Sequence, residues 1–135
     1  MRLTTAMLAD AAQVQGGKLY ILGGGFEMVR ARSMPVIHRN INVALVVEVG
    51  AEERNQDLDL LIDLIDEDGK AMGVQARGKL RVRDQPILPP GSPSVVPLVS
   101  PFYNVRFPEP KGYAFVVRHQ DDELGRIRLR VVHTQ

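Results

Sequence analysis

The clearest pattern along the chain is an alternation of apolar and polar residues with a period of two. It runs through residues 58–64 and 127–131, with mostly acidic or basic residues between the apolar ones, and Tyr113, Phe115 and Val117 recur with the same period. Successive side chains of a β-strand point to opposite faces, so such a segment offers one face to a core and one to solvent. The pattern therefore predicts three strands.

Other segments are rich in β-branched or alternating residues and are bounded by glycine, proline or charged turns. They cover residues 3–8, 18–22, 26–30, 41–49, 72–83 and 95–107. Residues 6–15 alone have room for a helical turn or two, because alanine and leucine favour helix. Eight or nine short strands without long helices predict an all-β fold, a two-sheet antiparallel sandwich of the immunoglobulin-like or C2-like kind.

A proline-rich segment makes the main interruption between the predicted strands. Five of the nine prolines predict a stiff loop that a central strand would not tolerate: Pro86, Pro89, Pro90, Pro93 and Pro97. No repeat or linker divides the chain, and 44% hydrophobic residues are enough for one core. Residues 1–135 are therefore expected to form a single β-sandwich domain.

One hairpin is predicted to the level of its register. In residues 66–70 a three-residue loop with Gly69 in the left-handed region is a favoured connection. Pairing Asp66 with Lys70 then sets Leu60 opposite Ala76 on the core face. On the other face Asp59 would lie opposite Arg77 and Asp57 opposite Lys79, and such opposite charges are mildly stabilising.

The net charge and the cysteine content exclude several kinds of partner and site. The formal net charge is +1, so no overall field would attract nucleic acid or an anionic membrane. There is no cysteine, which excludes disulfides, thiol catalysis and thiolate metal sites. No apolar run approaches the roughly 18 residues of a membrane helix, and the first ten residues do not resemble a signal peptide. We expect a cytoplasmic protein.

Two motifs resemble ligand-binding sites, but ordinary turns also explain them. The triplet Gly23, Gly24 and Gly25 would suit a phosphate loop, but a strand follows it where a helix would be needed. We expect a structural turn at a hairpin tip, where glycine adopts a positive φ. The acidic runs 66–68 and 121–123 would suit Ca²⁺ ligands, yet such residues are also ordinary at solvated turns.

Catalytic constellations are missing. The histidines, His38, His119 and His133, are not expected to converge on a metal ion. No serine has the surroundings of a nucleophile, so the sequence predicts a protein that is not an enzyme and has no cofactor or metal.

The most concrete candidate is a row of arginines. Arg126, Arg128 and Arg130 share one face of a predicted strand at a spacing of about 7 Å, and Arg118 on the preceding strand projects to the same side. Such a row would bind phosphate or carboxylate groups of an anionic partner. The favoured explanation is structural, with the arginines paired to acids such as Glu48 or Glu109 or lying on a solvated face.

The N-terminal third of the chain resembles a known family. The residues Leu8-Ala9-Asp10 and the run Gly17-Lys18-Leu19-Tyr20-Ile21-Leu22-Gly23-Gly24-Gly25-Phe26 are similar to an uncharacterised bacterial family of unknown function. Residues 66–69 and 112–115 fit the same family, so the likeness spans most of the chain. The resemblance implies a compact bacterial β-sandwich and supplies no catalytic residues.

Two functions stay open. The first is a non-catalytic interaction or structural module that binds a protein partner or itself, because residues 43–49 are apolar on both faces and need a cover on each. The second is a sandwich that binds a small ligand, either a sugar, an anion or calcium. Neither nucleic acid nor a membrane is an expected partner.

Overall fold

The computed structural model describes residues 1–135 and contains nine strands and one short 3₁₀ turn. The strands are β1 (Arg2–Gln15), β2 (Lys18–Gly24), β3 (Met28–Ala31), β4 (Val36–Val49), β5 (Leu58–Asp66), β6 (Ala71–Leu80), β7 (Ser94–Phe107), β8 (Gly112–His119) and β9 (Asp122–His133). The turn η1 covers Ala51–Glu53. The predicted all-β class and the number of strands are confirmed.

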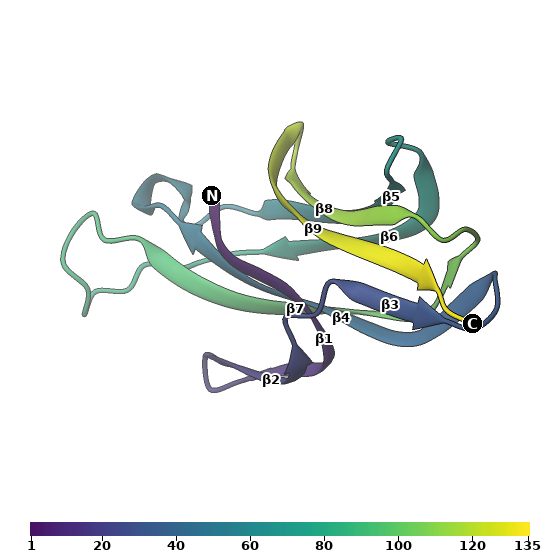
Figure 1. Ribbon diagram of the computed structural model, residues 1–135. Helices are drawn as coiled ribbons and strands as arrows, with labels where there is room; N and C mark the ends of the chain where they lie inside the picture. The colour runs from purple at the N-terminus through teal and green to yellow at the C-terminus, as the bar shows by residue number, and fades with distance from the viewer.

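The strands form two sheets that pack face to face (Figure 1). Sheet A has the order β2-β1-β4-β7, and sheet B has the order β3-β9-β8-β5-β6. Neighbours are antiparallel except β3 and β9, which run parallel. The expected two-sheet sandwich is confirmed, with this one departure from a purely antiparallel pattern.

The core lies between the sheets and is built from the inward positions of the alternating strands. Phe115 of β8 lies 5.1 Å from Phe102 of β7, centroid to centroid, and Phe107 lies 4.9 Å from Tyr113. Leu64 and Leu129 are buried beside them. Because a fully buried Leu or Phe side chain stabilises the fold by about 1.5–3 kcal/mol, these positions hold the two sheets together.

The expectation of a helical turn within residues 6–15 is wrong. These residues form the second part of β1, which pairs with β4 from Arg2 to Ala9 and with β2 from Ala9 to Gln15. Ladder pairing, first with β4 and then with β2, outweighs the helix propensity of the alanines, which is worth only tenths of a kcal/mol per residue.

The hairpin of β1 and β2 folds back beneath β4 and β7 (Figure 1), and Cα atoms of β2 approach β7 to within 8 Å although two strands separate them in the sheet. Asn40 and Asn42 donate hydrogen bonds from Nδ2 to the carbonyl oxygen of Asp10, each at 3.0 Å. Ala44, on the outward face of β4, has 0% exposure. The chain's own hairpin therefore supplies the cover that this strand needs.

The glycine triplet is not a hairpin tip. Gly23 and Gly25 have the expected positive φ values, +63° and +85°, but the triplet lies at the end of β2 of sheet A, where the chain leaves for β3 of sheet B. The actual tip of that hairpin is the pair Gly16 and Gly17, with φ of +55° and +74°. Two successive positive φ values are typical of the two-residue turns that match strand twist.

The β5–β6 hairpin begins as predicted and then changes register. Gly69 has φ +82°, and Asp66 N donates to Lys70 O at 2.9 Å. Leu60, however, pairs with Gly78 and not with Ala76, because the register shifts between Asp63 and Ile65.

Gly73 explains this shift. Its φ of +75° lies within β6, where a regular strand has negative φ, so extra residues of β6 bulge out at this point. The shift is by an even number of residues and keeps the faces unchanged. Asp59 consequently lies opposite Lys79, and Asp57 forms an ion pair with Arg81 at 3.4 Å.

The proline-rich segment is shorter as a loop than predicted. Pro97 and Pro101 lie within β7, which is an edge strand of sheet A. A proline lacks the N–H of a ladder hydrogen bond, so an edge strand is where a sheet accepts it.

Candidate anion-binding face

The outward face of sheet B brings the four candidate arginines together. Arg126, Arg128 and Arg130 are exposed at alternate positions of β9, and Arg118 lies at the end of β8. All four line one shallow hollow of about 920 Å³. We call this surface the arginine face.

Two hairpin ends frame the hollow. The β8–β9 turn and the β5–β6 turn both rise above sheet B (Figure 1). Arg118 and Arg126 line the hollow toward the first turn, and Glu67, Asp68 and Gly69 line it at the second. The hollow is thus basic along β8 and β9 and acidic at the β5–β6 turn.

Small apolar residues lie beneath the arginines on β8. Ala114, which lines the hollow, is 6% exposed and the neighbouring Val116 is 0% exposed, although both point away from the core. Their cross-strand neighbours are Arg128 and Arg126 respectively. An arginine beside a buried apolar residue is able to lay its aliphatic stem over it while the guanidinium group stays in water.

Two of the arginines form ion pairs. Arg126 donates to both carboxylate oxygens of Glu123, at 3.1 Å from Nε and 2.6 Å from Nη2. Arg130 lies 3.9 Å from Glu67, and the absence of a side chain at Gly112 leaves room for both groups. Arg118 and Arg128 have no carboxylate within 4.0 Å.

The acids suggested as partners from the sequence are wrong. Glu48 pairs with Arg2 at 2.9 Å, and Glu109 pairs with Lys111 at 3.5 Å.

The pKa of Glu123 responds to the positive charges of this face. This pKa is lowered, first by the hydrogen bonds from Arg126 and further by the charges of Arg126, Arg118 and Arg128, against a smaller opposing effect of burial. Three guanidinium groups therefore act on one carboxylate. Two of these positive charges have no ion-pair partner in the chain.

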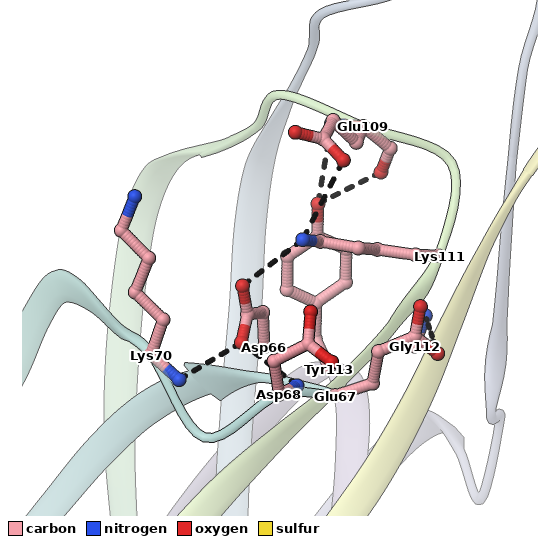
Figure 2. Close-up of polar contacts among 8 residues, drawn as sticks. All are labelled: Asp66, Glu67, Asp68, Lys70, Glu109, Lys111, Gly112 and Tyr113. Atoms are coloured by element: carbon pink, nitrogen blue, oxygen red, sulfur yellow. Dashed lines mark hydrogen bonds and ion pairs between the residues drawn. The ribbon is translucent and has the colours of Figure 1, made fainter.

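A second polar cluster forms the acidic rim (Figure 2). Asp66 is 4% exposed and accepts from Lys111 Nζ at 2.9 Å on Oδ2. Its Oδ1 accepts from the backbone N–H groups of Asp68 at 3.0 Å and Lys70 at 2.8 Å. These hydrogen bonds, that of Lys111 first, lower the pKa of Asp66, and Asp66 in turn raises the pKa of Lys111.

Tyr113 anchors the loop that carries Lys111. Its hydroxyl donates to Glu109 O at 2.7 Å and accepts from Glu109 N at 3.2 Å. Burial raises the pKa of this phenol. A tyrosine bonded to backbone a few residues upstream is a corner that sandwich folds use at the start of a strand. The loop is therefore held rigidly beside the β5–β6 turn.

The other candidates of the sequence lie apart from this face or are engaged. Both oxygens of Asp66 are already used, so the run 66–68 does not present free calcium ligands together. His119 Nδ1 contacts Asp59 O at 2.7 Å, His133 Nε2 contacts Arg32 O at 2.9 Å, and His38 lies 6.4 Å from the Phe26 ring. No group of three or more His, Cys, Asp or Glu side chains has the geometry to hold a metal ion.

Sequence reasoning missed the pair of Lys111 and Asp66. The two residues are separated by 45 positions, and no periodic pattern connects them. The one local signal was Asp66 itself, since an aspartate before a turn commonly accepts hydrogen bonds from the turn's backbone.

Fold and face together define a β-sandwich with a hollowed, arginine-lined outer surface. The chain belongs to DUF6941, a family of unknown function, whose sequence model matches residues 4–132. The expectation of an uncharacterised family is thereby confirmed. No curated protein matches the chain, and no helix in it is long and apolar enough to span a membrane.

Proposed function

We propose that this protein is a non-catalytic binding module that receives an anionic partner on the arginine face. The observation that supports this is the pair Arg118 and Arg128, which face the same hollow without an ion-pair partner. Like charges on one surface repel each other, and a bound anion would remove that repulsion. The recognised group is a carboxylate or a phosphate, which arginine binds through paired N–H donors.

The carboxylate of Glu123 already contacts this face in the way that we propose for a bound anion. It is held by Arg126 in a two-point contact and is affected by the charges of Arg118 and Arg128. An anion that joins Glu123 would engage the two unpaired arginines.

The hollow favours a compact anion or an acidic side chain over a nucleic-acid strand. Its far end carries Glu27, Glu67 and Asp68, which would repel a continuous run of phosphates. Tyr113 is the one aromatic residue of the lining, and it is 3% exposed. Single strands need exposed aromatic rings for base stacking, and sugar sites use such rings in the same way.

The test uses inorganic pyrophosphate and a hexaglutamate peptide as probes, in calorimetric titrations and thermal melts at low salt. A ligand of the folded state raises the melting temperature. We expect at least one probe to bind, and replacement of both Arg118 and Arg128 by Gln to weaken it at least about tenfold. Preference for pyrophosphate would identify a small anion, and preference for hexaglutamate would identify an acidic protein segment.

Two variants make the test specific. The double replacement Arg39→Gln with Arg106→Gln removes the same charge from exposed positions of sheet A and should leave binding nearly unchanged. Glu123→Gln frees Arg126 and should tighten binding. Failure of both probes, or equal losses in the two arginine pairs, would contradict the proposal.

The proposed location is the cytoplasm. Cell fractionation of the full chain tests it, and recovery in the membrane or secreted fraction would oppose it.

A further inference from the structure

Each sheet of the sandwich leaves two edges, and three of the four carry a device against pairing with other chains. In β7, Pro97 and Pro101 lack N–H groups. In β6, the bulge at Gly73 interrupts the edge, and β3 is only four residues long. Such devices are how natural sheets avoid joining edge to edge.

The edge of β2 has none of them. The strand Lys18–Gly24 contains no proline, has its one positive φ at Gly23 near its end and carries a single charge at its start. Tyr20 is 51% exposed and Leu22 is 73% exposed on its outward face. An exposed apolar edge of this kind is a template for another strand.

The register of the hairpin identifies which backbone groups are free. Gly16 and Gly17 form a two-residue turn, so Lys18 and Gln15 are the first pair, and Tyr20 and Leu22 continue the pairs that exchange hydrogen bonds with β1. The alternate residues Leu19 and Ile21 therefore direct their N–H and C=O groups away from β1, toward the open edge.

We propose that two copies of the chain join through their β2 strands, antiparallel about a two-fold axis at Ile21. The strand is self-complementary in this register. Tyr20 of one copy lies opposite Leu22 of the other, and this apolar pair occurs twice. Lys18 lies opposite Gly24 of the second copy, which keeps the two lysines at opposite ends of the interface. Ile21 pairs with its own symmetry mate by backbone hydrogen bonds, as an isologous contact requires.

This pairing joins the four strands of sheet A from each copy into one continuous sheet. It leaves the arginine face of each copy open, since that face belongs to the other sheet. The inference is independent of the proposed anion binding.

Light scattering coupled to size-exclusion chromatography tests the inference on the full chain. We expect the wild-type chain to have twice the 15.0 kDa mass of a single chain at micromolar concentration. Ile21→Pro should give the monomer mass, because it removes an N–H that faces the open edge and not β1. A wild-type chain that stays monomeric over the whole range would overturn the proposal.

A charge exchange tests the register and does not rely on proline. Tyr20→Lys alone and Leu22→Glu alone should each raise the dissociation constant at least about tenfold, since each sets a charge against an apolar side chain. The double variant should restore the dimer, because each introduced lysine then faces an introduced glutamate. Gln13→Lys is the matched control: it lies on the same outward face but on β1. Dimers that survive both single variants, or a control that dissociates, would contradict pairing through β2.

Discussion

The two outward faces of this sandwich begin from similar strands and end differently. On sheet A the outward positions of β4 include Ala44, which is fully buried, and Asn42, which donates a hydrogen bond to Asp10 of the β1–β2 hairpin. On sheet B the outward positions of β8 include Val116, which is equally buried, but its cross-strand neighbours are the charged residues Arg126 and Asp63. One face lies against the chain's own hairpin, and the other is bordered by charged side chains.

This difference supports the proposal that the arginine face is the surface that binds a partner. A face that lies against the chain's own hairpin has its contacts made in the folded monomer. The arginine face keeps its guanidinium groups available, and those of Arg118 and Arg128 have no carboxylate within 4.0 Å. Burial of outward-facing apolar residues alone therefore does not show whether a surface still has charged groups free to bind a ligand.

The largest expected effect comes from a charge placed on the closed face. Ala44→Lys would bury an ammonium group beneath the hairpin, so we expect a loss of about 3 kcal/mol or more in unfolding free energy. Urea denaturation measures it. Gln75→Lys is the matched control, since it adds the same group to the exposed outward side of sheet B, opposite Asp63. A comparable loss in both variants would show that the two faces do not differ as described.

The second effect concerns the rim of the open face. Asp66→Asn leaves Lys111 without its nearest carboxylate, and we expect a larger loss of stability than any single change among the arginines. The pKa of Asp66 is lower in the folded chain than in the unfolded one, so the stability it contributes is complete above about pH 4 and is lost as the pH falls through the folded value.

Thermal melts between neutral and acidic pH check this effect. The wild-type melting temperature should fall more steeply with acid than that of Asp66→Asn. Lys111 has the opposite sign: its raised pKa means that its contribution is present below about pH 10 and is lost as the pH rises through the folded value. Parallel acid curves for the two chains would show that this pair does not control acid stability.

The third effect tests the turn that carries the rim. Gly69→Val places a β-branched residue at φ +82° and should cost about 1–2 kcal/mol, because such residues are strained at positive φ. Gly78→Ala is a control in the same hairpin, at a glycine with open space around its Cβ position and no positive φ. Chemical denaturation compares them, and an equal cost at both sites would show that φ is not the cause.

The sequence predicts the arginine face better than it predicts the β1–β2 hairpin or the pairing of β5 with β6. Alternation was sufficient for the class and for Arg126, Arg128 and Arg130, because a period of two places them on one side of any strand. It failed for residues 6–15, where pairing with two neighbours outweighs alanine's helix propensity. It also failed for the partner of Leu60, because a glycine such as Gly73 permits a positive φ within a strand but does not require it. Contacts between residues far apart, such as Lys111 with Asp66, depend on strand order, which no local pattern contains.

The smallest expected change in unfolding free energy follows replacement of Arg128, an unpaired charge on the open face. Arg128→Gln keeps much of the side-chain stem beside Ala114 and removes a guanidinium group that has no ion pair. A solvated charge of this kind contributes little to folding, so the unfolding free energy should change by less than about 1 kcal/mol. Arg126→Gln should cost more, because it leaves Glu123 without its two hydrogen bonds. Chemical denaturation of both variants gives the comparison, and pyrophosphate titration of the same samples gives the second measurement. If Arg128 were a structural residue, its replacement would lower stability and leave binding unchanged; for a receptive face the reverse is expected.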